Sequence, residues 1–232
     1  MKSIIFDSGS IISLVTNNLL WVLEPLKERF GGKFYITPAV KHELVYKPLR
    51  TKRFELEAMQ VYQYLKNGIL SVISDQRIKK TADKLLDIAN HSFRARGRWM
   101  KIVHPAEIET LAADAVLDAE AVVIDERTVR MLLENNLRLT ELMEKKLQCK
   151  IKPNQNNLKD FKKILEDVQI IRSTELITIA YKLGLLDKYL IEKSPLIKYP
   201  KRRLLDASLW ALKVRGCAIS KKEIDEIIKI EA

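Results

Sequence analysis

Through residue 171, short apolar segments alternate with helical segments, and this alternation constrains the fold more than any other feature of the sequence. Five segments have the composition of buried strands, at 3–6, 33–36, 69–73, 121–124 and 168–171. Strands that are joined through helices pair in parallel, because the helix returns the chain to the same end of the sheet. The pattern therefore predicts an α/β fold of three layers, α/β/α, around a central and mostly parallel five-stranded sheet.

Capping signals and apolar periodicity place the helices. Thr37-Pro38 and Pro105 are typical helix starts, and Gly216 and Ser220-x-x-Glu223 predict a helix end and a capping box. We expect helices at about 10–29, from 38 onward, and at 54–66, 76–97, 105–117, 127–147, 173–183, 203–215 and 220–230, with a turn or loop at 153–157. The expected organisation is an α/β domain over 1–172, with a helical C-terminal extension over 173–232 packed on it.

Composition narrows the class of protein. Of the 232 residues, 47% are hydrophobic, which excludes a largely disordered chain. No apolar run approaches the roughly 18 residues that span a bilayer, and Asp7 interrupts the N-terminal apolar stretch where a signal peptide would continue. Neither Cys149 nor Cys217 belongs to a CxxC pair, so both are expected as free thiols. We expect a cytoplasmic protein without a membrane partner.

The formal net charge of +11 favours polyanionic partners, nucleic acid above all, although a surface rich in Lys and Glu also suits life at high temperature. Basic residues gather at 50–53, 93–101 and 198–203. The middle stretch combines Trp99 with four cations, which are Arg94, Arg96, Arg98 and Lys101. Arginine suits phosphate, and aromatic rings stack on unpaired bases.

Two interpretations of this middle stretch stay open. It leads directly into the helix that begins at Pro105, so we expect it to lie near a site on that helix and to contact RNA. The alternative is a solvated helix end whose Trp99 packs into the core.

Two of the predicted strands end in the same way. Segment 3–6 is followed by Asp7, and segment 121–124 is followed by Asp125. In a parallel sheet both carboxylates emerge at the C-terminal edge, where open α/β folds bind ligands. Neighbouring strands lie only about 4.8 Å apart, and carboxylates that close repel each other unless a cation lies between them. Oxygen-rich sites of this kind suit Mg²⁺ or Mn²⁺.

Two predicted helices carry further acids that could join this edge. Glu43 follows the Thr37-Pro38 start, and Glu107 and Glu109 follow Pro105. Acids in the first turn of a helix also interact favourably with its dipole, so a purely local role is the alternative for each.

Taken together, these motifs resemble those of PIN domains, a family of metal-dependent nucleases. The first is IIFDSGSIISL, with Asp7; the second is ITPAVKHEL, with Glu43; the third is HPAEIETLAADAVLDAEAVVIDERTVR, with Glu109 and Asp125 at the spacing that the family pattern expects. The resemblance covers most of residues 1–175. The later segments IIRSTELITIAYKLGLLD and LLDASLWALKVRGCAIS are similar to archaeal-type members.

The resemblance implies a ribonuclease. The residues that would form its catalytic and metal site are Asp7, Glu43, Glu109 and Asp125. They would hold one or two Mg²⁺ or Mn²⁺ ions, which activate water for hydrolysis of an RNA phosphodiester. Ser10 and Glu107 are supporting candidates, and Gly9 departs from the family by lacking a hydroxyl side chain. The resemblance leaves open a homodimer, and both an RNA-processing role and a toxin role with an antitoxin partner.

Two other functions compete with this one. A phosphatase with an Asp nucleophile also begins with an apolar strand ending in Asp, but Gly9 stands where its second Asp would act as the general acid. A non-catalytic, basic RNA-binding scaffold that retains the acids stays open, and metal binding separates it from the nuclease.

Overall fold

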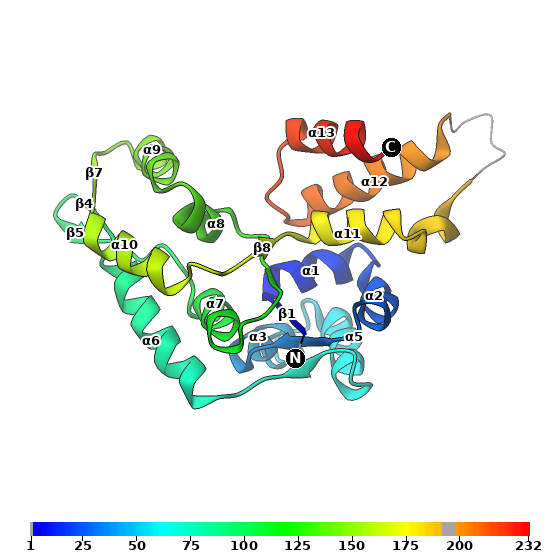
Figure 1. Cartoon of the computed structure of the whole chain (residues 1–232), viewed down its shortest axis with the longest axis horizontal. Coiled ribbons are helices and arrows are strands. Elements are labelled where there is room, and N and C mark those ends of the chain that lie inside the picture. The colour runs from blue at the N-terminus through cyan, green and yellow to red at the C-terminus, as the bar shows by residue number, and fades with distance from the viewer. Residues whose placement is uncertain (1, 192–197) are drawn as a thin grey trace.

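The computed structural model describes residues 2–191 and 198–232. Its central sheet has the strand order β3-β2-β1-β6-β8, and every pairing in it is parallel. The strands are β1 (Ser3–Phe6), β2 (Lys33–Ile36), β3 (Ser71–Val72), β6 (Ala121–Val123) and β8 (Ile170–Ile171). The predicted α/β class and all five predicted strands are confirmed, and β1 and β6 are neighbours at the centre of the sheet (Figure 1).

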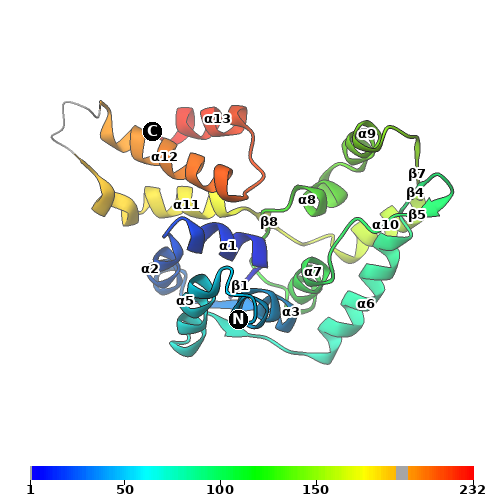
Figure 2. The ribbon, with the colours of Figure 1, turned by 180° about the vertical axis from the view of Figure 1, so that it is seen from behind.

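Helices cover both faces of the sheet, as Figures 1 and 2 show from opposite sides. Alternate residues of β1 point to opposite faces. Phe6 packs into a core with α1, α2, α5 and α11–α13, whereas Ile5 packs into a second core with α6–α10. The helical elements are α1 (Ser8–Thr16), η1 (Leu20–Val22), α2 (Leu23–Phe30), α3 (Pro38–Lys41), η2 (His42–Tyr46), α4 (Lys47–Leu49), α5 (Glu55–Lys66), α6 (Gln76–Asn90), α7 (Pro105–Leu117), α8 (Arg127–Glu134), α9 (Asn136–Leu147), α10 (Gln155–Ile164), α11 (Ser173–Lys182), η3 (Leu185–Tyr189), α12 (Pro200–Arg215) and α13 (Lys221–Glu231).

Helix starts follow the capping signals of the sequence. The Thr37 side chain accepts a hydrogen bond from Val40 N at the start of α3, and Ser220 and Glu223 form the expected capping box of α13. Helix α7 has the predicted bounds. At each of these helix starts, side chains nearby in the sequence bond to backbone N–H groups that have no partner within the helix. Such starts can therefore be predicted from local sequence.

Two predicted helices are interrupted. The one expected over 10–29 breaks after Thr16, because Asn18 takes a left-handed conformation (φ 55°) and a short 3₁₀ turn precedes α2. The one expected over 127–147 breaks at Asn135, whose side chain accepts from Arg138 N and caps α9. Asparagine favours helix caps and left-handed turns. At Asn18 and Asn135 this preference ends the helix, although the apolar periodicity predicts that it continues.

The helix expected over 76–97 ends at Asn90. The chain then forms an antiparallel hairpin of β4 (Phe93–Ala95) and β5 (Arg98–Trp99), whose turn residues Arg96 and Gly97 both have positive φ. Strand β4 also pairs with β7 (Ile151–Pro153), and this second sheet and the following helix α10 were not predicted. The pairing buries Phe93 completely, so a contact between segments distant in sequence overrides the helical pattern.

The C-terminal helices share a core with the sheet. Leu176 and Ile177 of α11, Leu209 of α12 and Ile224 of α13 belong to the same buried cluster as Phe6 of β1. The boundary expected after residue 172 falls between β8 and α11, but the apolar core is continuous across it. The helical extension therefore completes one face of the sheet.

Asp114 is a buried carboxylate away from the edge where the strands end. It lies on α7, only 2% of it is exposed, and among the described residues its Oδ1 atom has no hydrogen-bond partner. Burial raises the pKa of Asp114 to about 7, and the nearby charge of Asp118 adds to the effect. An acid whose pKa is raised on folding destabilises the fold progressively as pH rises from the unfolded value to the folded one.

We therefore expect Asp114→Asn to stabilise the protein at pH 8 by at least about 3 °C in melting temperature. The gain should shrink progressively as pH falls from 7 toward 4, because the carboxyl of the folded wild type becomes protonated and the cost of burying its charge disappears. Thermal denaturation across pH 4–8 measures it, with Asp160→Asn, an exposed change on α10, as the control. A gain of equal size at every pH would contradict this explanation.

Candidate functional site

Asp7 and Asp125 lie side by side at the C-terminal ends of β1 and β6. Asp7 N donates to Val123 O at 3.0 Å, and each of the two aspartates is 2% exposed. Gly9 lies between them: a Cβ atom there would stand 3.3 Å from Asp7 Oδ2 and 3.9 Å from Asp125 Cβ. The missing side chain at Gly9 therefore leaves room around the Asp7 carboxylate.

Asp7 has only part of its hydrogen-bonding capacity satisfied. Its Oδ2 atom accepts from Gly9 N at 3.0 Å, which caps α1, while the buried Oδ1 atom has no partner among the described residues. The pKa of Asp7 is raised to about 6, chiefly by burial and to a lesser extent by the charges of Glu43 and Asp125, against the lowering effect of backbone hydrogen bonds. A buried acceptor without a donor is costly unless a cation or another donor reaches it.

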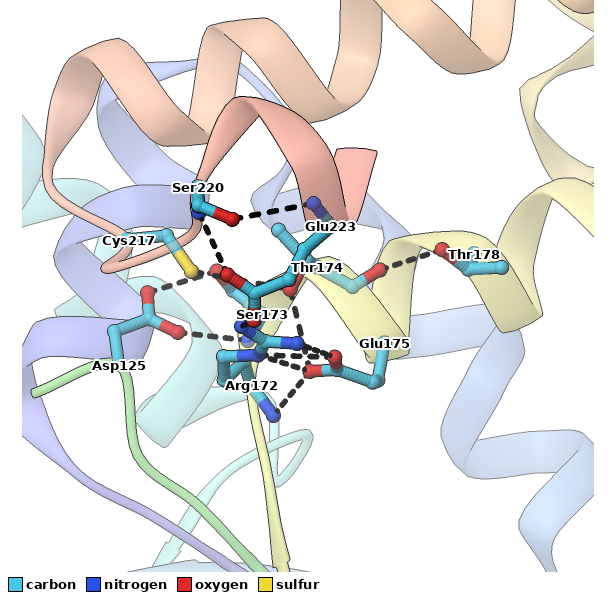
Figure 3. Close-up of polar contacts among 9 residues, drawn as sticks. All are labelled: Asp125, Arg172, Ser173, Thr174, Glu175, Thr178, Cys217, Ser220 and Glu223. Carbon is cyan, nitrogen blue, oxygen red and sulfur yellow. Dashed lines mark hydrogen bonds and ion pairs between the residues drawn. The ribbon is translucent and has the colours of Figure 1, made fainter. Parts of the chain in front are cut away.

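Asp125, in contrast, is held at both oxygens by hydrogen-bond donors. Ser173 N donates to Oδ1 at 2.8 Å, and Ser173 Oγ donates to Oδ2 at 2.8 Å (Figure 3). Ser13 Oγ of α1 donates to the same Oδ2 at 2.6 Å. These three short hydrogen bonds orient the carboxyl group at the strand end.

The start of α11, which carries Ser173, is itself held by an ion-pair network. Arg172 bonds both carboxylate oxygens of Glu175 and donates from Nη1 to Glu223 Oε1 of α13 at 2.7 Å (Figure 3). Although partial burial raises the pKa of Glu223, its hydrogen bonds with Ser220 and Arg172 lower it to about 2. The network links α13 to the backbone that binds Asp125.

Glu43 and Glu107 come to this edge from two helices. Glu43 lies in η2, a π-helical turn in which Lys47 N donates to His42 O, just before Pro48, which has no N–H to donate. Its Oε2 atom accepts from Ser8 Oγ at 2.7 Å. Turns of this type are frequent at functional sites.

Glu107 is the acid of α7 that belongs to this group. Burial raises its pKa to about 7, and the charges of Asp7, Glu126 and Glu43 add to the effect against a backbone hydrogen bond from His104. That bond, from His104 N to Glu107 Oε2, measures 2.9 Å.

Glu109 points elsewhere. Its Oε2 atom accepts from Ala39 N at 3.3 Å at the start of α3, and it lines a different hollow, together with Pro38 and Asp75. Residues two apart on a helix do not face the same side, so Glu107 and Glu109 cannot both reach Asp7. The structure therefore brings together Asp7, Glu43, Glu107 and Asp125, and Glu109 lies outside this group.

Ser10, a supporting candidate, acts on the backbone. Its buried Oγ atom donates to Asp7 O at 2.8 Å. The hydroxyls that donate to these acids are those of Ser8, Ser13 and Ser173, of which Ser13 and Ser173 were not predicted from the sequence. Their signal was weak, because Ser13 and Ser173 reach Asp125 only through tertiary packing.

The four acids fit a divalent cation by their chemistry, although not in their present positions. Within residues 2–191 and 198–232, no three acidic, His or Cys side chains converge closely enough to hold one ion. Glu43 and Glu107 are turned toward Ser8 and His104 N, and they would have to rotate to converge. In the same ranges, no ion pair neutralises any of the four acids, and Asp7 Oδ1 is free to accept. Hard oxygen donors without a protein counter-charge suit Mg²⁺ or Mn²⁺.

A cavity of about 530 Å³ opens from this edge toward α5. Ser8, Glu43 and Glu107 line it at the acidic end, and Arg53 and Phe54 line it as well. The basic stretch 50–53 therefore contributes to the same cavity as the acids, which was not predicted from the sequence.

The second basic stretch lies away from the carboxylates, contrary to our expectation. The β4–β5 hairpin lies at the outer edge of the molecule in Figures 1 and 2, whereas β1 and α1 lie centrally. All five candidate RNA-binding residues are exposed, namely Arg94, Arg96, Arg98, Trp99 and Lys101, and none of them lines the cavity. Trp99 is 45% exposed with the Arg94 guanidinium 5.5 Å from its ring centre, so it does not pack into the core.

No family model, curated protein or solved structure matches the chain. The resemblance to PIN domains therefore depends on the sequence motifs alone. Among the described residues, no helix combines the length and apolarity required to cross a membrane.

We expect Ser173→Ala to lower the free energy of unfolding by about 2 kcal/mol, because Asp125 loses a donor inside the protein. Ser208→Ala on α12 is the matched control, since Ser208 Oγ donates at the same 2.8 Å distance to an uncharged carbonyl, that of Leu204. Urea denaturation measures both variants. Equal losses would show that the hydroxyl of Ser173 does no more than an ordinary helix hydroxyl.

Proposed function

We propose that this protein is a PIN-like, metal-dependent ribonuclease. The observation that carries the proposal is the gathering of Asp7, Glu43, Glu107 and Asp125 at the C-terminal edge of neighbouring parallel strands, with no cationic partner among the described residues and one free buried oxygen. Acids from four separate elements are costly to bring together. A divalent cation bound by the carboxylates would compensate their mutual repulsion, because each of them attracts it.

Each residue of the group has a distinct part in this proposal. The four carboxylates would hold Mg²⁺ or Mn²⁺, which when bound supplies activated water and charge stabilisation at a phosphodiester. Ser13 and Ser173 orient the Asp125 carboxylate through their hydrogen bonds, and Ser10 orders the backbone of Asp7. The proposal replaces Glu109 with Glu107, because only Glu107 faces the other acids.

RNA is the proposed substrate because the chain is strongly basic and its exposed hairpin combines arginines with an aromatic ring. The rival is a basic scaffold that binds RNA without cleaving it. A homodimer and an antitoxin partner remain predictions of the resemblance.

Glu107→Gln and Glu109→Gln test the site with the same change two residues apart. We expect Glu107→Gln to weaken Mn²⁺ binding and to lower the cleavage rate at least about tenfold, because the cation loses a charged ligand. Glu109→Gln should retain Mn²⁺ binding and more than half of the rate. Calorimetric titration of Mn²⁺ and cleavage of single-stranded and structured RNAs measure both effects.

Asp7→Asn and Asp125→Asn complete this experiment as changes at the strand ends. If Mn²⁺ neither binds nor stabilises the wild type, and Asp7→Asn leaves cleavage unchanged, the nuclease proposal fails and the scaffold is favoured. If Glu109→Gln abolishes activity while Glu107→Gln does not, the assignment from the motif is right and the one from geometry is wrong.

The hairpin provides a separate prediction. Arg94→Ala/Arg96→Ala should weaken RNA binding and flatten its dependence on salt, because fewer counterions are released. Fluorescence anisotropy at several salt concentrations measures the slope, with Lys159→Ala/Lys163→Ala on α10 as the charge-matched control. An unchanged slope would exclude the hairpin from the RNA-binding surface.

A further inference from the structure

The cavity beside the acids has an aromatic and cationic side that the proposed catalytic residues do not use. Its acidic end contains Ser8, Glu43 and Glu107. Lys47, Thr51, Arg53 and Phe54 also line it, together with one further acid, Glu57. Ile12 of α1, which also lines the cavity and is 40% exposed, contributes apolar surface. At about 530 Å³, it has the size of a pocket for a small organic ligand. A ligand here would contact carboxylates, cations and an apolar wall together.

Phe54 is held open to this cavity by an unusual backbone conformation. It has a φ of 63° just before α5, and Lys52 two residues earlier has a φ of 57°. A bulky residue with positive φ is rare, and such conformations cost on the order of 1 kcal/mol or more. Despite this cost, the ring is not used in the core, since it is 46% exposed. Strain of this kind is concentrated at binding sites.

Arg53 lies directly against this ring. Its guanidinium carbon is 4.9 Å from the centre of the Phe54 ring, which holds a positive charge at the cavity wall. Neither Arg53 nor Lys47 forms an ion pair among the described residues. Arg53 and Lys47 are therefore suited to bind an anionic group, and the exposed Phe54 ring is suited to stack on a planar group of the same ligand.

We propose that this cavity receives an unpaired nucleotide of the RNA strand, with its base stacked on Phe54 and its phosphate on Arg53 and Lys47. The inference extends the proposed function, because the neighbouring phosphate of the same strand would then lie toward Glu43 and Glu107. A base in a duplex is covered by its neighbours and its partner and cannot enter such a cavity. Phe54 therefore makes the site selective for single-stranded RNA.

Binding without cleavage tests this inference separately from the nuclease proposal. The probes are a fluorescein-labelled single-stranded oligouridine and a fully paired RNA hairpin, measured by anisotropy in EDTA. Phe54→Ala should weaken binding of the single strand about fivefold or more, with little change for the hairpin, because base–aromatic stacking is lost. Phe54→Tyr should restore the affinity.

Leu56→Ala is the matched control, because Leu56 is 68% exposed on the same helix but does not line the cavity. Arg53→Ala should lower the salt slope of single-strand binding by about 0.7, whereas Phe54→Ala should leave the slope unchanged. Thermal melting of each variant checks that the fold is retained.

The outcomes distinguish the two proposals. If the wild type cleaves RNA with Mn²⁺ but Phe54→Ala binds both probes as the wild type does, the cavity inference is overturned and the nuclease stands. If Phe54→Ala and Leu56→Ala lose affinity equally, the cavity inference is also overturned. If Phe54→Ala selectively loses the single strand in a protein that does not cleave, the cavity binds unpaired RNA and the nuclease proposal fails.

Discussion

Two carboxylates buried side by side at the ends of adjacent parallel strands impose the main electrostatic constraint on this structure. Asp7 and Asp125 are each 2% exposed, so water cannot screen their repulsion effectively. The two carboxylates differ in how many hydrogen bonds the surrounding residues donate to them. Asp125 receives three hydrogen bonds from serine hydroxyls and a backbone N–H, whereas Asp7 has a raised pKa and one oxygen without a partner among the residues that the structure describes. One acid is thus held at both oxygens by hydrogen-bond donors, and the other is left able to accept a cation or a proton.

This constraint explains why the C-terminal helices are part of the site. Two of the three hydrogen bonds to Asp125 come from Ser173, the first residue of α11. Arg172, the residue before it, donates a hydrogen bond to Glu223 on α13. Helix α13 therefore helps to orient Asp125, which lies near the middle of the sequence. The C-terminal helices that pack on the sheet therefore also help to position the carboxylates at its C-terminal edge.

Basic and aromatic groups occur in two separate places. The β4–β5 hairpin carries arginines and Trp99 at the outer edge, while Arg53 and Phe54 line the cavity that reaches the acids. A strand of RNA bound at the cavity would meet the hairpin only if it were long enough to cross the intervening surface. The arrangement suits a local contact that positions one nucleotide and a distant contact that adds affinity.

The sequence by itself determined the sheet and the approximate position of its chemistry. Apolar segments between helices required parallel strands, and an Asp after two of them required acids at one edge, which the neighbouring pair β1 and β6 confirms. Side-chain direction on α7 could not be read in the same way. The motif favoured Glu109, but the way α7 packs turns Glu107 toward Asp7 and Glu109 toward α3. Strand pairing also overrode a helical pattern at Phe93. Apolar periodicity indicates which secondary structure one segment prefers. Strand register, helix packing and the hydrogen-bond partners of Asp125 depend on contacts between segments far apart in the chain, so only the tertiary structure decided them.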